Sequence, residues 1–205
     1  MPPPPLTAEI AAAAARLVVE EGLDYGPAKQ RALKALGLRG VPSAQLPDNE
    51  QVEEEVRAHL ALFHADTQPA ELAALRAAAL VWMERMAEFR PHLVGAVWRG
   101  TATRLNDVHL QLFCDDAKSA EIALLDAGVS YAVGSTRGPR GATVDVLSVS
   151  QPSPALGEPV TVHLVILDHD DLRGALRPDA QGRAPRGDAA ALRRLMQADA
   201  GRPPA

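Results

Sequence analysis

The first ninety residues carry apolar side chains at intervals of three and four, which is the period of an amphipathic helix. Thr7 stands where a first helix should begin, and Asp48 with Gln51 three residues later has the spacing of a capping box. We therefore expect a helical domain over residues 7–90, after a disordered lead-in at residues 1–6. The inward positions expected in its four helices are Ile10, Ala13, Ala14, Leu17 and Val18, then Ala28, Ala32, Leu33 and Leu36, then Val52, Val56, Leu60 and Phe63, then Leu72, Leu75, Ala79, Trp82, Met83, Met86 and Phe89.

Beyond residue 90 the apolar period becomes two, which is typical of strands. The first such strand follows Asn106, and its alternation places Asp107, His109 and Gln111 on one face and Val108, Leu110 and Leu112 on the other. A helix over residues 117–126 is expected next, followed by a strand at residues 129–133 and a hairpin over residues 142–167. In the helix, Ile122, Leu124 and Leu125 are expected to face the sheet.

These patterns predict an α+β protein. An N-terminal all-helical arm or bundle is followed, over residues 91–198, by a mixed sheet flanked by helices. Residues 134–141 are expected to form a mobile loop, and residues 199–205 a disordered tail. Asp116 and Asp188 precede the later helices as expected caps.

Composition narrows the classes of function. The net charge is −5 and aromatic residues make up 3% of the 205 residues, so neither a basic stripe nor a base-stacking platform is expected, and we do not expect nucleic acid as a partner. One cysteine, Cys114, excludes an internal disulfide. With no export signal and no apolar run of membrane-spanning length, a cytoplasmic protein without membrane partners is expected.

The segment from residue 94 to residue 113 carries the one motif with chemical content. A Gly-Ala pair follows a short apolar run, an Arg-Gly pair lies inside the next ten residues, and an Asp-x-His strand comes after them. This segment resembles the nucleotidyltransferase superfamily in its small bacterial form, which has Gly-Ser, Arg-Gly and Asp-x-Asp at these positions. The resemblance implies a nucleotidyltransferase-like fold that binds a nucleotide near Gly95, Ala96, Arg99, Gly100 and Thr101, with Asp107 as a catalytic acid.

Two positions depart from the family pattern. Ala96 replaces the serine, and His109 replaces the second aspartate. Two carboxylates on one strand face can hold a pair of Mg²⁺ ions, whereas imidazole suits Zn²⁺ and other transition metals. We therefore expect that standard Mg²⁺-dependent transfer is lost, and that the protein is a nucleotide-binding or protein-binding regulator. The helical arm is the expected surface for a protein partner.

Two alternatives remain open, and they differ in the third site residue. The run that matches the family's third acidic strand ends in His163, while Asp145 on the preceding strand is a competing candidate. An active nucleotidyltransferase with Mg²⁺ would use Asp107 and either Asp145 or an acid near Asp168, adding a nucleoside monophosphate to a small molecule or protein. A transition-metal protein would bind a metal such as Zn²⁺ through Asp107, His109 and His163.

A cluster of arginines between residues 173 and 194 is a candidate for receiving a phosphate or an acidic partner. A solvated loop is the default expectation for such a segment. The sequence contains no Gly-x-x-x-x-Gly-Lys-Ser/Thr loop, which argues against an ATP-dependent ligase or kinase of that type.

Overall fold

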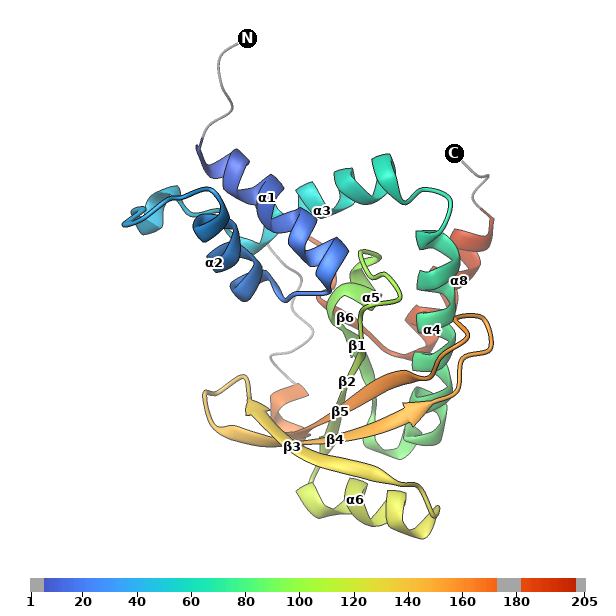
Figure 1. Cartoon of the computed structure of the whole chain (residues 1–205). Helices are drawn as coiled ribbons and strands as arrows, with labels where there is room; N and C mark the ends of the chain where they lie inside the picture. The colour runs from blue at the N-terminus through green and yellow to red at the C-terminus, as the bar shows by residue number, and fades with distance from the viewer. Residues whose placement is uncertain (1–5, 173–181, 202–205) are drawn as a thin grey trace. The chain divides into compact units, whose positions relative to one another are not determined.

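The computed structural model describes residues 6–172 and 182–201, and it is an α+β protein in which N-terminal helices precede a mixed sheet (Figure 1). The chain divides into two compact units, one formed by residues 1–69 with residues 101–105, the other by residues 70–100 with residues 106–205. The start of the expected lead-in, residues 173–181 of the arginine cluster and residues 202–205 of the expected tail lie outside the described residues.

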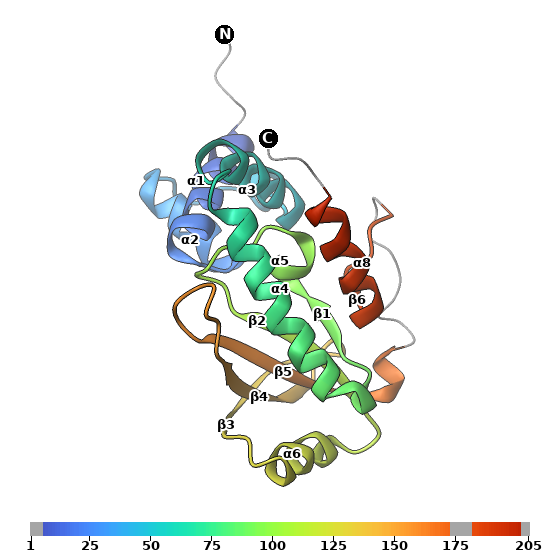
Figure 2. The same ribbon diagram turned by 90° about the vertical axis from the view of Figure 1, so that its right-hand side faces the viewer.

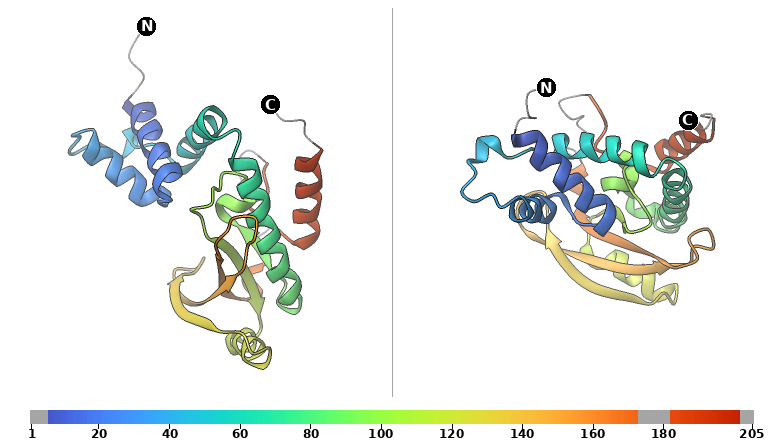
Figure 3. Two further views of the ribbon diagram at one scale, coloured as in Figure 1. Left: turned by 45° about the vertical axis from the view of Figure 1, so that its right-hand side comes forward. Right: turned by 45° about the horizontal axis from the view of Figure 1, so that its top comes forward.

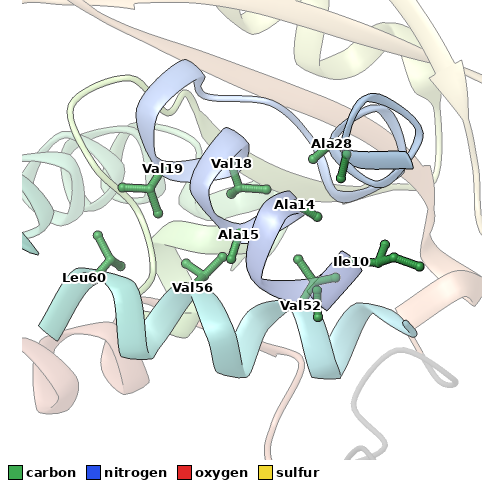
Figure 4. Close-up of a cluster of buried hydrophobic side chains, with 11 residues drawn as sticks. Ile10, Ala14, Ala15, Val18, Val19, Ala28, Val52, Val56 and Leu60 are labelled. Carbon is green, nitrogen blue, oxygen red and sulfur yellow. The ribbon is translucent and has the colours of Figure 1, made fainter. Parts of the chain in front are cut away.

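The first unit is built from helices α1 (Leu6–Glu21), α2 (Tyr25–Ala35) and α3 (Asn49–Phe63), with a short 3-10 turn at Ser43–Gln45. Their buried faces form one core cluster, drawn in Figure 4. Its members are mostly small aliphatic residues, as the low aromatic content requires: Ile10, Ala11, Ala14, Ala15, Val18, Val19, Ala28, Ala32, Val52, Val56 and Leu60.

The third helix starts as its sequence predicts. The Asp48 side chain accepts from the Gln51 backbone N–H at 2.8 Å, and the Asp48 N–H donates to the Gln51 side chain at 2.9 Å. The expectation that Phe63 faces inward is wrong, because its side chain is 65% exposed. Phe63 lies in the last turn of α3, where its ring packs against the His59 ring with centroids 4.7 Å apart.

Helix α4 (Gln68–Arg85) and the 3-10 turn after it (Ala87–Phe89) bury every inward position expected of them. Helices therefore extend to residue 89, as expected. From Ala70 onward, however, α4 belongs to the second compact unit. The division between units falls at residues 69 and 70, inside the segment where one helical domain was expected.

A six-stranded sheet in the order β3-β4-β5-β2-β1-β6 forms the centre of the second unit. Every neighbouring pair is antiparallel except β2 with β5, which is parallel. The third strand runs on to Arg137, so half of the expected loop is strand, because residues 134–137 pair with β4. The strands are β1 (His92–Val94), β2 (Val108–Cys114), β3 (Tyr131–Arg137), β4 (Thr143–Gln151), β5 (Val160–Asp168) and β6 (Arg186–Gly187).

The two faces of this sheet differ in chemistry. One face is aliphatic and buried: Leu93, Val108, Leu110, Leu112, Leu147, Val149, Val162, Leu164 and Ile166. Helices α4, α6 (Ala117–Asp126) and α8 (Ala189–Ala200) lie next to the sheet, and α4 and α8 are side by side (Figures 2 and 3). The alternation expected for residues 107–112 is confirmed, since Val108, Leu110 and Leu112 are fully buried.

Helices α6 and α8 begin at the expected caps. Asp116 accepts from the Lys118 N–H at 3.0 Å, and Asp188 accepts from the Ala191 N–H at 2.7 Å. The inward face expected for α6 is wrong in part, because Ile122 is 52% and Leu125 is 59% exposed. Helical geometry turns by about 100° per residue. The side of α6 that carries the buried Ala120 and Leu124 therefore cannot also carry both Ile122 and Leu125.

One buried arginine ties the helices of the second unit together. The Arg76 Nε on α4 donates to the Val97 carbonyl at 3.1 Å and an Nη to the Trp98 carbonyl at 3.3 Å, both near the end of α5 (Gly95–Arg99). Arg76 also forms an ion pair with Asp199 on α8. Burial lowers the pKa of Arg76, and the negative charge of Asp199 partly offsets that effect.

Replacing Arg76 by methionine should lower the free energy of unfolding by about 2–4 kcal/mol, because two carbonyls of α5 lose a charged donor in a buried place. Urea denaturation of the purified variant measures this change. Arg193→Met is the matched control, since the exposed Arg193–Glu84 pair should contribute about 1 kcal/mol or less. Equal losses in the two variants would contradict the role assigned to Arg76.

Candidate functional site

Two histidines lie side by side on the face of the sheet opposite the aliphatic core. The parallel register of β2 and β5 pairs His109 with His163. Both neighbours of each histidine along its strand are buried, so alternation directs both imidazoles to the other face. Their rings stack with centroids 4.9 Å apart and an angle of 26° between the planes.

Asp107 and Ser148 complete a chain of hydrogen bonds through His163. The His163 Nε2 lies 3.1 Å from the Asp107 Oδ2, and its Nδ1 lies 2.8 Å from the Ser148 Oγ. A carboxylate can only accept, so Nε2 carries a hydrogen, and in the neutral form of the ring Nδ1 accepts a hydrogen bond from the Ser148 hydroxyl. The side chain of His163 is 24% exposed and that of Asp107 is 49% exposed, so solvent reaches the site.

The histidines belong to a row of side chains that crosses the sheet. Successive strand registers align Arg186 on β6 with Val94, His109, His163 and Ser148. We call these five residues the polar row, after four of its members. Since paired residues share a face, the row lies on the side opposite the core.

Arg186 is a half-buried member of the polar row. It donates to the side-chain oxygen of Gln111, the next residue after His109 on the same face of β2. Burial lowers the pKa of Arg186. Its Nε is buried and has no hydrogen-bond partner within residues 6–172 and 182–201.

The residues expected to bind a nucleotide follow one another along the chain, from the first residue of α5 to the residue after its C-terminal cap. Gly95 has a φ of +74°, which suits glycine, and it turns the chain from β1 into α5 directly after Val94, the partner of His109. Ala96 follows it. Arg99 and Gly100 lie at the other end of α5, where Gly100 approaches the Arg76 guanidinium. Thr101 belongs to the first unit.

Neither acid proposed to complete a carboxylate pair joins Asp107. Asp145 lies two residues before the buried Leu147 on β4, so it shares the core face and not the face of Ser148. Asp168 pairs with Cys114, while Asp107 immediately precedes Val108. Cys114 lies six residue steps beyond Val108 on the strand, which corresponds to about 20 Å.

The polar row brings together few of the groups that either metal considered from the sequence would need. A pair of Mg²⁺ ions needs bridging carboxylates, and of the three candidate acids only Asp107 lies beside the polar row. For a transition metal, no group of three or more His, Cys, Asp or Glu side chains among the described residues is arranged to hold an ion. Both nitrogens of His163 face protein partners, and one of these partners is Asp107 itself.

Sequence reasoning missed Ser148 and did not single out Arg186. On β4, the residues of this face are Val144, Val146, Ser148 and Ser150, which form no recognisable motif. Only the register between β4 and β5 places Ser148 beside His163. Arg186 was one of several arginines in the segment 173–194, and a two-residue strand at residues 186–187 gives no periodic signal. The alternation of Val160–Asp168 was the one available signal for the placement of His163.

Cys114, at the far end of β2, is not a reactive thiol. It is 5% exposed, and burial raises the pKa of its thiol to about 11, with the negative charges of Asp115, Asp116 and Glu88 adding to the effect. A hollow of about 790 Å³ next to it is lined by acidic side chains such as Asp115 and Asp116, by apolar ones such as Phe113, and by Arg90 and His169. A thiol with a raised pKa carries little of the reactive thiolate at neutral pH.

Comparison with known proteins assigns no family. No protein-family model matches the chain, and no curated protein matches it either. Among the described residues, no helix has the length and apolar character that crossing a membrane requires.

The neutral His163 ring should carry its hydrogen on Nε2, because Asp107 accepts there. Two-bond ¹H–¹⁵N correlation of ¹⁵N-histidine-labelled protein reports this tautomer directly. Asp107→Ala should produce a mixture of tautomers, while Asp145→Ala, on the other face, should leave the spectrum of His163 unchanged. A wild-type ring protonated on Nδ1 would contradict the hydrogen-bond chain.

Proposed function

We propose that the second unit is a nucleotidyltransferase-like domain that no longer transfers nucleotides and acts as a nucleotide-binding regulator. The observation that carries this proposal is the hydrogen bond between the His163 Nε2 and the Asp107 carboxylate, together with the stacking of the His109 ring on the His163 ring. In an active transferase the corresponding carboxylate pair binds Mg²⁺. Here two imidazoles lie beside Asp107 in place of a second carboxylate.

The arrangement around this site supports the same proposal. Strand β1, the short helix α5 and strand β2 follow each other in the order that the family resemblance implies. The register between Val94 and His109 holds the Gly95 turn next to the histidines. Ala96 offers no hydroxyl at the position where the family has a serine. These features support a nucleotide site in which the groups for metal-assisted transfer have been replaced.

Imidazole and guanidinium groups suit a ligand that carries negative charge without a metal. An imidazole such as that of His109 can donate a hydrogen bond to a phosphate oxygen, and Arg186 carries a permanent positive charge nearby. An active transferase would instead require a second carboxylate at the polar row, which neither Asp145 nor Asp168 supplies. The geometry therefore favours metal-independent binding over transfer.

Thermal unfolding in the presence of ATP and GTP tests the proposal, once with EDTA and once with Mg²⁺. Binding should persist in EDTA and add about 2.7 kcal/mol of stability at a ligand concentration 100 times the dissociation constant. His109→Ala should weaken binding by about threefold to tenfold, as expected for one lost hydrogen bond. His169→Ala is the matched control, because His169 lies beyond the other end of β5.

The same samples are incubated with nucleotide labelled at the α-phosphate and with Mg²⁺. Label should not enter the protein or any added acceptor. Incorporation that disappears in Asp107→Ala would establish an active transferase and overturn the proposal. Failure of every nucleotide to raise the unfolding temperature would also overturn it.

A further inference from the structure

Positive and protonatable groups outnumber acids at the polar row. Arg186, His109 and His163 lie there, and the neighbouring acid Asp107 is engaged by His163. The remaining strand residues of this face in the described part of β4 and β5 are uncharged, such as Val146, Ser148, Thr161 and Val165. The surface therefore has an excess of donors over acceptors.

Arg186 differs from the buried Arg76 of the same unit in having no anionic partner among the described residues. Arg76 is buried and pairs with Asp199, which compensates its charge. Arg186 donates to an uncharged amide, Gln111, and no carboxylate within the described residues forms an ion pair with it. A partly desolvated guanidinium without an anionic partner is unfavourable. Its buried Nε also lacks a hydrogen-bond acceptor among those residues.

We infer that Arg186 anchors an anion of the phosphate class on the polar row, between Gln111 and His109. This inference rests on the proposed function in one respect, since the anion would be the phosphate end of the nucleotide. Free pyrophosphate offers the same chemistry without a base or sugar. Adenosine offers the base and sugar without the charge.

The geometry of the row suits such a ligand. Guanidinium presents five N–H donors in a planar fork, and Gln111 occupies only part of it, so donors remain for phosphate oxygens. Gln111 and His109 are successive residues on one face of β2, about 7 Å apart along the strand. Val94 lies between Arg186 and His109 in the row and adds no competing charge.

Isothermal titration with pyrophosphate in EDTA, at constant ionic strength, tests the inference. Wild-type protein should bind pyrophosphate saturably, and Arg186→Gln should weaken that binding by about tenfold to a hundredfold, as the loss of charge-assisted hydrogen bonds predicts. Arg193→Gln removes an equal charge from exposed α8 and should bind as the wild type does. Equal affinities of wild type and Arg186→Gln would overturn the inference.

A second measurement on the wild-type protein does not depend on how the variant folds. Phenylglyoxal modifies arginine side chains, and peptide mass mapping gives the rate at each position. Pyrophosphate should slow the modification of Arg186 and leave the rate at Arg193 unchanged. An unchanged rate at Arg186 in saturating pyrophosphate would overturn the inference.

Separate titrations with ATP and adenosine distinguish this inference from the proposed function. If ATP binds wild type and Arg186→Gln equally, the nucleotide proposal stands and the role of Arg186 is wrong. If pyrophosphate binding depends on Arg186 but no nucleotide binds, the anion site stands and the nucleotide proposal is wrong. Adenosine binding as tight as ATP binding would also count against the anion site.

Discussion

The parallel pairing of β2 with β5 is the constraint on which the site depends. Strand β2 also pairs with β1, and β5 also pairs with β4, but only the register between β2 and β5 places His109 beside His163. Because side chains alternate between faces, a shift of one residue would move His163 to the core face and expose Val162 or Leu164. The burial of these aliphatic residues therefore fixes the position of the imidazoles as firmly as it fixes the fold.

The same alternation decides which acids can take part in chemistry. Asp145 lies three residues before Ser148 on β4, yet its side chain is on the opposite face of the sheet. Helix α6 approaches that face, and the charge of Asp145 acts on Lys118 of this helix. This leaves two imidazoles and Arg186 in the polar row, with Asp107 beside them. A site of this composition suits an anionic ligand better than a cluster of Mg²⁺ ions.

The sequence predicted features that depend on local spacing and missed features that depend on partners distant in the chain. The capping box at Asp48 and the alternation around His109 follow from a few neighbouring residues, and both are present in the structure. The neighbours of Ser148 and Arg186 come from other strands, so no local pattern revealed their contacts. Ile122 was misplaced because an apolar side chain on a short helix does not by itself say which face the core takes.

The most direct test of this account is a titration of ¹⁵N-histidine-labelled protein with ATP in EDTA, followed through the imidazole signals. Signals of His109 and His163 should shift saturably and together, because one ligand would lie over both stacked rings. The signal of His169, which lies beyond the other end of β5, should stay in place. Unmoved signals of His109 and His163 at millimolar ATP would contradict the claim that the polar row binds a nucleotide.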